Sequence, residues 1–256
     1  MIFYPIATLM AAGIQEILII TTPEDQHLFV KLLGDGSQIG VRFKYEIQVK
    51  PNGLADAVRL GTNFANGSSI ALILGDNIFH GTGLGRELSK YKDVVGAQIF
   101  AYEVANPEDY GVIEFNQSGG INSIFEKPKE PKSRFAIPGL YFYDSSVFDV
   151  VQTVQPSARG ELEITTLNEK FFQAGLLKAS VLPRGTSWFD TGTFESLQDA
   201  SNYVRILEAR QNLRVACLEE IAWRLGWIST GQLRLLANSE ENIGLQNYLL
   251  SIIRSS

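Results

Sequence analysis

The hydrophobic pattern along the first part of the chain predicts helices and strands in alternation. Apolar stretches closed by Gly13 and Gly34 are typical of helices, and the shorter β-branched runs between them are typical of strands. The expected elements alternate from helix to strand and lie at residues 4–12, 16–21, 22–34, 41–49, 54–64 and 70–79. This order predicts an α/β fold with a Rossmann-like, mixed and mostly parallel sheet flanked by helices.

The rest of the chain continues the alternation and then becomes entirely helical. Strands are expected at 97–104, 138–143, 177–183 and 186–189, a hairpin at 112–125, and helices at 84–91, 146–154 and 167–174. From residue 194 to residue 256 the pattern predicts helices alone. Because no linker or repeat separates a second unit, we expect one domain over 1–256 with a helical C-terminal subregion at about 194–256.

Two aspartates follow apolar runs and are the first candidates for chemistry. Asp76 ends the run IALILGDN, and Asp190 ends the run WFD. In open α/β sheets ligands bind at the carboxyl ends of strands, where an aspartate is well placed to hold a Mg²⁺ that carries phosphates. The two aspartates are therefore expected to converge on one ion. The alternative is that each of them only caps its own turn.

Other polar and aromatic residues beside predicted strands are candidates for ligand contacts. Glu126 is an acceptor suited to sugar hydroxyls, and Lys127 is a point charge suited to a phosphate, although a solvated loop pair is the commoner reading of such a dipeptide. Tyr110 and Gly111 can offer backbone N–H groups or form a plain turn. Trp188 can stack on a ring or belong to the core.

Composition excludes several classes of function. The net charge of -6 argues against a nucleic-acid surface. The single Cys217 excludes an internal disulfide and fits a cytoplasmic protein. His27 and His80 are the only histidines, so a Ser-His-Asp or Cys-His site is not expected. The apolar stretch 2–14 has no preceding cation and is too short to cross a membrane, so we expect neither a signal peptide nor a membrane protein.

A series of ordered motifs resembles the sugar nucleotidylyltransferases. The motifs are LLGDGSQIGVRFKYEIQ, PNGLADA, LILGDNIFHG, NPEDYGVIEF, FEKPKEPKS, GLYFYD, PSARGELEIT and WFDTGTFESL. The resemblance implies the fold of the nucleotide-diphospho-sugar transferases, Mg²⁺ as cofactor, and transfer of a thymidylyl group from dTTP to glucose 1-phosphate. The products would be dTDP-glucose and pyrophosphate, for dTDP-rhamnose and cell-surface polysaccharide biosynthesis.

The resemblance also implies a role for each matching residue. Asp76 and Asp190 would hold the metal and, with Lys127 on the sugar phosphate, would form the catalytic set. The remaining substrate contacts would be Gln48, Gly53 and Leu54 at the thymine, Tyr110, Gly111, Glu126, Tyr141 and Glu161 at the sugar, and Trp188 as a wall. A second site, for feedback inhibition by a dTDP-sugar, would include Arg184, Gly185, Ala216, Ile221 and Arg224, where surface charge is the alternative for the two arginines.

Apolar residues in the last helices predict self-association. They are Trp223, Leu225, Trp227, Leu233, Leu235, Leu236, Leu249 and Leu250. These apolar residues are more numerous than a single solvent-exposed helix face normally carries. We therefore expect a homo-oligomer, which the resemblance implies is a tetramer.

Two departures from the family pattern affect these expectations. Family members begin with a strand and a loop of the form L-A-G-G-x-G-T-R-L, which this sequence lacks, and Thr166 stands where the family has aspartate. We therefore expect a domain that is N-terminally incomplete, has unpaired backbone groups beside the missing strand, and is a poor catalyst by itself. The alternatives are an impaired or regulatory homologue that binds nucleotide sugars, or a nucleotidylyltransferase for another sugar phosphate.

Overall fold

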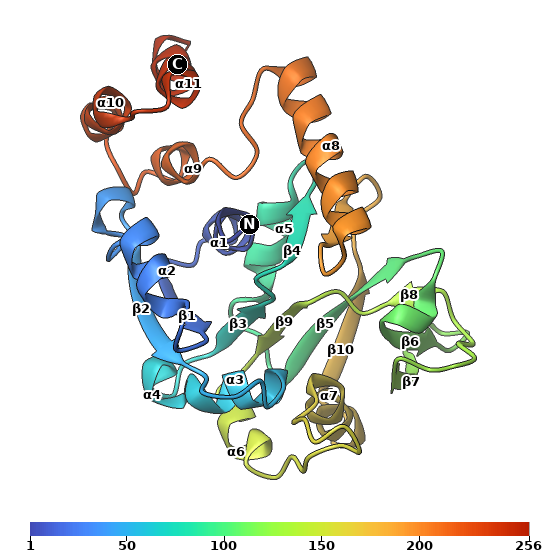
Figure 1. The fold of residues 1–256 in the computed structure, drawn as a ribbon. Coiled ribbons are helices and arrows are strands. Elements are labelled where there is room, and N and C mark those ends of the chain that lie inside the picture. The colour runs from blue at the N-terminus through green and yellow to red at the C-terminus, as the bar shows by residue number, and fades with distance from the viewer. Residues whose placement is uncertain (256) are drawn as a thin grey trace.

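The computed structural model describes residues 1–255 as an α/β fold with helices on both faces of the central sheet (Figure 1). The helices are α1 (Phe3–Ala11), α2 (Gln26–Leu33), α3 (Leu54–Leu60), α4 (Thr62–Ala65), α5 (Leu84–Leu88), α6 (Val147–Val151), α7 (Ile164–Gln173), α8 (Phe194–Gln211), α9 (Leu218–Arg224), α10 (Thr230–Ser239) and α11 (Ile243–Arg254). The strands are β1 (Glu16–Thr21), β2 (Arg42–Ile47), β3 (Ile70–Ile73), β4 (Asn77–His80), β5 (Ala97–Glu103), β6 (Gly111–Phe115), β7 (Ile121–Glu126), β8 (Phe135–Ala136), β9 (Leu140–Tyr143), β10 (Leu177–Val181) and β11 (Ser187–Asp190).

The central sheet runs in the order β3-β9-β5-β8-β6-β7, with β10 beside β5. The pairs β1–β2 and β5–β10 are parallel, whereas β9 runs antiparallel to both β3 and β5. Both β3 and β5 run antiparallel to β9, so they point in the same direction. Because β9 lies between them, they do not pair with each other. The α/β class is confirmed, but the sheet contains more antiparallel pairs than the expected mostly parallel arrangement.

Local boundaries differ from the expected ones where side chains or turns intervene. The Thr22 hydroxyl donates to the Asp25 carboxylate at 2.9 Å instead of capping a helix, so α2 begins at Gln26. The expected helix 54–64 is interrupted at Gly61 into α3 and α4. The expected strand 70–79 is two strands, because the chain turns at 74–76 and pairs β4 with β11 rather than extending β3.

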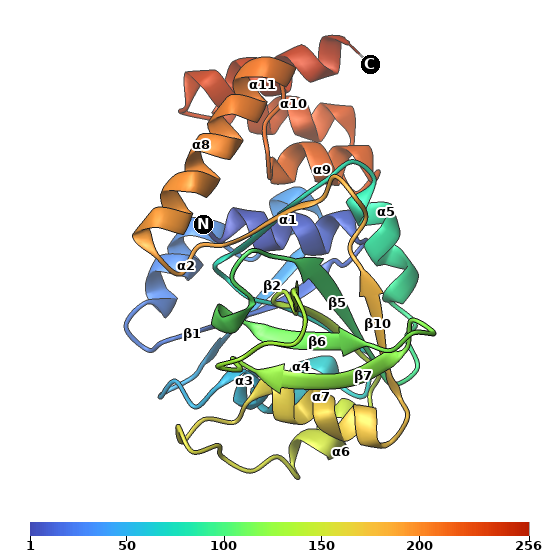
Figure 2. The ribbon, with the colours of Figure 1, turned by 90° about the vertical axis from the view of Figure 1, so that its right-hand side faces the viewer.

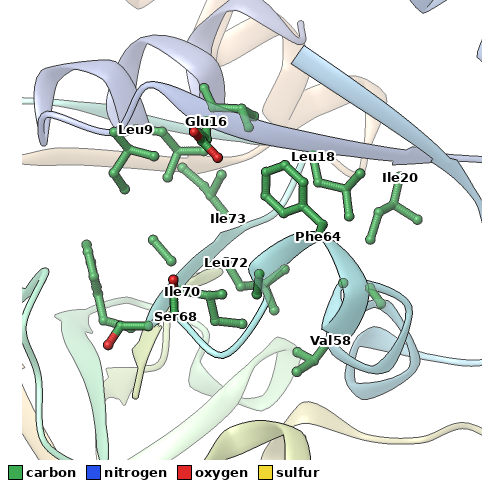
Figure 3. A pocket seen from close by; sticks show the side chains of 18 of the residues that line it. Leu9, Glu16, Leu18, Ile20, Val58, Phe64, Ser68, Ile70, Leu72 and Ile73 are labelled. Carbon is green, nitrogen blue, oxygen red and sulfur yellow. The ribbon is translucent and has the colours of Figure 1, made fainter. Parts of the chain in front are cut away.

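An apolar slot of about 420 Å³ separates β1 from β3 (Figure 3). Its lining includes Leu18 and Ile20 of β1, Ile70 and Leu72 of β3, and Phe64 of α4. Among the described residues β1 pairs only with β2, and β3 pairs only with β9, so each strand has one edge without a neighbouring strand. This explains why β3 is partly exposed along its length, although its apolar sequence predicts complete burial.

The C-terminal helices cover the end of the fold that carries α1, β1 and β2 (Figure 2). Leu233 and Leu249 are fully buried there, and most of the other apolar residues from which we expected self-association pack against the same core. Leu235 and Leu225 are the exposed exceptions, at 70% and 42%. Most of these apolar residues therefore belong to an internal core. None of the helices in the described part of the chain has both the length and the hydrophobicity to cross a bilayer.

Candidate active site

A cleft of about 480 Å³ opens beside the ends of β7, β9 and β11 and gathers most of the residues that the sequence singled out. Those that line it are Gln48, Gly53, Leu54, Tyr110, Gly111, Glu126, Lys127, Tyr141, Glu161, Trp188 and Asp190. Asp76 does not line the cleft itself but lies at the turn before β4, whose first residue Asn77 does. Residues separated by more than a hundred positions therefore surround one cavity.

The antiparallel pair β4–β11 brings the two aspartates together. Its register places Asn77 opposite Asp190, and the Thr191 backbone N–H donates to the Asp76 carbonyl at 3.0 Å. Asn77 is 1% exposed and donates to the Asp76 carboxylate at 2.9 Å, while its own oxygen accepts from the Trp188 indole at 2.7 Å. The buried Asn77 amide therefore orients the Asp76 carboxylate next to Asp190.

The electrostatics around Asp190 show a surplus of negative charge. Burial and then the neighbouring Asp76 raise the pKa of Asp190, and a backbone hydrogen bond from Gly192 and the charge of Lys127 only partly oppose them. The Gly192 N–H donates to Asp190 at 3.1 Å, so this aspartate does cap its own turn, yet it also faces Asp76. Asp190 therefore caps its own turn, and its role as a metal ligand stays a prediction.

The donor set of this pair fits Mg²⁺. Carboxylate oxygens are the ligands that Mg²⁺ prefers, and the ion commonly takes one or two of them and completes its shell with phosphates and water. Over residues 1–255 no group of three or more His, Cys, Asp or Glu side chains is arranged for a metal. Asp76 and Asp190 are thus the protein's two candidate ligands, and a cation would relieve their mutual repulsion.

One part of the cleft is built around Glu126 at the end of β7. The Thr165 hydroxyl donates to one of its carboxylate oxygens, and the Arg159 guanidinium lies 3.5 Å from the other. Arg159 also donates to Glu163 at 3.0 Å, which fixes the guanidinium between two carboxylates. Glu126 is therefore held by neighbours rather than left in a solvated loop.

Lys127 occupies a strained position at the same strand end. Its φ of 41° lies in the left-handed region that residues with a side chain rarely adopt, and its backbone N–H donates to the Tyr110 carbonyl at 3.1 Å. The side chain is exposed, and its charge lowers the pKa of Asp190 across the cleft. Backbone strain of this kind is concentrated at functional positions.

Another part of the lining is formed by the turn 51–53 and the segment before α7. Gly53 has φ of 100°, and a Cβ there would lie 2.4 Å from the Leu162 carbonyl oxygen. Leu162 donates its N–H to Asn52 at 2.6 Å and accepts from Ala55 at 3.0 Å. Only glycine permits this approach, which also brings Glu161 to the cleft.

Aromatic residues also line the cleft. The rings of Tyr110 and Trp188 have centroids 5.1 Å apart, and Trp188 is 8% exposed. Tyr141 is almost completely buried in β9, and burial raises the pKa of its hydroxyl. Trp188 therefore belongs to the core and also lines the cleft, and its stacking on a ring stays a prediction.

Comparison with known proteins places the chain in a family. Residues 1–205 match the family described as nucleotidyl transferase. Glucose-1-phosphate thymidylyltransferase of Mycobacterium tuberculosis is 51% identical over 253 residues, which are 99% of this chain and 88% of that protein. The protein of the same name from Neisseria meningitidis is 46% identical over 255 residues, with the same two shares. This chain belongs to the glucose-1-phosphate thymidylyltransferase family.

Solved structures agree with the family assignment. A candidate glucose-1-phosphate thymidylyltransferase from Bacillus anthracis, in complex with sucrose, has a TM-score of 0.72 at 38% identity and covers 80% of this chain and 82% of its own. UDP-glucose pyrophosphorylase in complex with UDP-glucose has a TM-score of 0.66 at 24% identity and covers 80% of this chain and 86% of its own. The second likeness shows the fold alone.

The residues expected at a regulatory site lie only partly together. A second cavity, of about 270 Å³, is lined by residues of α1, α5 and α9, and Ala216 and Ile221 belong to it. The other three predicted residues, Arg184, Gly185 and Arg224, are exposed and do not line it. Arg224 instead pairs with Glu220 at 2.7 Å, which is the surface-charge alternative for this arginine.

Several residues of the cleft were not singled out from the sequence. Asn77, Arg159 and Thr165 hold the candidate ligands described above, and Asp109 and Glu163 also line the cavity. Arg159, Glu163 and Thr165 all stand in the quoted motif PSARGELEIT, so the density of polar residues in that motif was an available signal. Nothing in the local sequence indicates that Asn77 is buried.

Proposed function

We propose that this protein transfers a thymidylyl group from dTTP to glucose 1-phosphate and forms dTDP-glucose and pyrophosphate. The observation that carries the proposal is one cleft, with Asp76 in the turn beside it, that is lined by Asp190, Lys127, the oriented Glu126, Gln48, Tyr110 and Trp188. The family to which the chain belongs supports the choice of nucleotide and sugar.

In the proposed reaction an oxygen of the sugar phosphate attacks the α-phosphorus of dTTP in line. The bond from that phosphorus to the pyrophosphate oxygen breaks as the new bond forms, and no proton has to move because the attacking phosphate is already an anion. Positioning and charge neutralisation therefore supply the acceleration. Lys127 would hold the sugar phosphate as a point charge, and its left-handed backbone directs it from the end of β7.

Asp76 and Asp190 would hold Mg²⁺ beside the phosphates, with Asn77 keeping the first of these carboxylates in place. The bound ion supplies Lewis-acid neutralisation of phosphate charge. Glu126 would accept hydrogen bonds from glucose hydroxyls, since Thr165 and Arg159 already fix its orientation. Trp188 and Tyr110 would exclude water from the sugar side.

Binding of the product tests this proposal, because dTDP-glucose occupies the base end and the sugar end at once. Isothermal titration of the purified chain should give saturable binding of dTDP-glucose, weaker binding of dTDP, and little binding of CDP-glucose or GDP-glucose. Chromatography of a mixture of dTTP, glucose 1-phosphate and MgCl₂ with the chain checks for the product directly. A folded chain that ignores dTDP-glucose, or prefers CDP-glucose or GDP-glucose, contradicts the assignment.

We also propose that the second cavity takes a dTDP-sugar as a feedback inhibitor and that the protein is a cytoplasmic homo-oligomer, with four subunits. Ala216 and Ile221 in that cavity support the first part. The exposed apolar side chains of α8, Phe194 at 95% and Ile206 at 51%, support the second. Light scattering at micromolar concentration measures the assembly, and a monomeric mass for the folded protein would count against it.

A further inference from the structure

Asp56 is a buried carboxylate directly behind the base end of the cleft. It lies in the first turn of α3, is 3% exposed, and does not line the cavity. Its oxygens accept from the Gln48 amide at 3.0 Å and the Asn52 amide at 3.3 Å, and they pair with the Arg59 guanidinium. Burial acts to raise the pKa of Asp56, but these hydrogen bonds outweigh burial and hold the pKa below its ordinary value.

The Gln48 amide is consequently fixed in one of its two orientations. Its nitrogen donates to the Asp56 carboxylate and also to the Gly53 carbonyl, at 3.2 Å. Both partners are acceptors only, so the network assigns nitrogen to this side, and both N–H groups are used. Among residues 1–255 no hydrogen bond reaches the amide oxygen of Gln48, which is the polar atom left for a ligand in the cleft.

We propose that Asp56 is a positioning residue that locks Gln48 with its oxygen toward the nucleotide, so that the cleft requires a base with a ring N–H donor. This inference rests on the proposed function and deepens it. Thymine and uracil carry such a donor at N3, whereas cytosine has a lone pair at that position and would face the Gln48 oxygen acceptor to acceptor. The carboxamide therefore does not read thymine through a paired donor and acceptor, because Asp56 and Gly53 occupy its donors.

Two analogues of dTTP separate the acceptor role from the donor role of Gln48. In 3-methyl-dTTP the N3 donor is absent, and in 4-thio-dTTP the O4 acceptor is weakened. For the unmodified chain with MgCl₂, isothermal titration should show that methylation at N3 weakens binding about tenfold or more, as expected when a buried polar group loses its partner. The 4-thio change should alter the dissociation constant by less than about threefold, because Gln48 has no free N–H for O4.

The variant Asp56→Asn tests whether this carboxylate sets the pattern. The new amide offers Gln48 a donor as well as an acceptor, so only the Gly53 carbonyl still favours one orientation of Gln48 and the preference weakens. The penalty for methylation at N3 should shrink by at least about threefold, and the penalty for 4-thio substitution should grow. The matched control is Asp144→Asn, since Asp144 likewise accepts local hydrogen bonds, from Gly96 and Ser146, but lies away from the cleft. The control should keep the wild-type pattern even where its melting temperature falls.

The outcomes distinguish the inference from the function on which it rests. An identical analogue pattern in the wild type and in Asp56→Asn, or no penalty for 3-methyl-dTTP in the wild type, overturns the role of Asp56 and leaves thymidylyl transfer standing. Preference of the wild type for CTP or GTP overturns the proposed function itself. A folded chain that binds none of these nucleotides overturns both.

Discussion

Asn77 gives the sharpest test of how the carboxylate pair is held. Its amide donates to Asp76 at 2.9 Å and accepts from Trp188 and from the Gly139 N–H; Asn77 itself is 1% exposed, whereas Asp76 lies exposed at the turn. The substitution Asn77→Asp keeps the shape and both accepted hydrogen bonds. It replaces the donated hydrogen bond by a contact between two carboxylates.

The penalty follows from the charge of the new carboxyl group. Two unit charges 2.9 Å apart repel by about 6 kcal/mol at an effective dielectric constant of 20. The new group avoids this by keeping its proton, which limits the charge penalty to about 1.4 kcal/mol for each pH unit above its unfolded pKa of about 3.9. The limit is about 1.5 kcal/mol at pH 5 and about 5.6 kcal/mol at pH 8.

The loss of stability caused by Asn77→Asp should therefore grow as pH rises. A carboxyl group whose folded pKa is raised destabilises the fold above its unfolded pKa and increasingly so as pH rises toward the folded value. We expect Asn77→Asp to lower the free energy of unfolding by about 1 kcal/mol at pH 5 and by about 3–5 kcal/mol at pH 8. Urea denaturation at the two pH values, followed by circular dichroism, measures both.

The hairpin β6–β7 offers a matched control. Asn122 is exposed and donates to Glu114 at 3.2 Å, so Asn122→Asp makes the same exchange of an amide for a carboxylate in front of another carboxylate. Solvent screens that pair, and its effect should stay below about 0.5 kcal/mol at either pH. Equal effects of the two substitutions, or a pH-independent loss for Asn77→Asp, would refute the argument that Asn77 is a buried spacer for Asp76.

Four further predictions concern the cleft and its supports. Asp76→Asn and Asp190→Asn should each reduce the gain in dTTP affinity that Mg²⁺ produces by roughly tenfold or more, as measured by titration calorimetry with and without MgCl₂. Because the pKa of Asp190 is raised, Mg²⁺ competes with a proton there, so apparent Mg²⁺ affinity should fall as pH is lowered toward that pKa, with proton release visible as a buffer-dependent enthalpy. Thr165→Val should weaken dTDP-glucose binding roughly tenfold and leave dTDP binding unchanged, because it frees the Glu126 carboxylate; equal losses for both ligands would contradict a role confined to the sugar. Amide hydrogen exchange should be faster in β1 than in β5, since β1 borders the slot on one edge and β5 is paired on both; slower exchange in β1 would show that the slot is closed in solution.

Local pattern sufficed for most of the elements. The run Glu16–Thr21 forms β1 over the residues expected, and α8 begins at residue 194, where the helical region was expected to begin, and ends before Asn212, which adopts the left-handed conformation that closes a helix. The ordered motifs likewise identified the family, and every residue expected at the substrate or the metal lines the cleft except Asp76. Spacing of apolar residues and turn chemistry are local quantities, so a sequence reports them directly.

The local pattern does not show which distant residues become neighbours in the fold. Two-residue β8 is too short for any periodicity, and it forms because β5 and β6 pair with it on either side. The apolar run of β3 predicts burial on both faces, but the slot beside β1 leaves it partly exposed. Which strands become neighbours depends on the free energy of the whole packed sheet, which no single segment determines.

The sequence by itself therefore determined the class of fold, the family and the kinds of side chain in the cleft. The tertiary structure decided how those side chains constrain one another. Asp76 and Asp190 are 114 positions apart in the chain, and only the register of β4 against β11 makes them neighbours that raise a pKa. Asp56 is an ordinary acidic residue of a first helical turn until α3 packs and buries it, where an unpaired charge would be costly. Burial and register set its hydrogen bonds, and those bonds decide which atom of Gln48 faces the cleft.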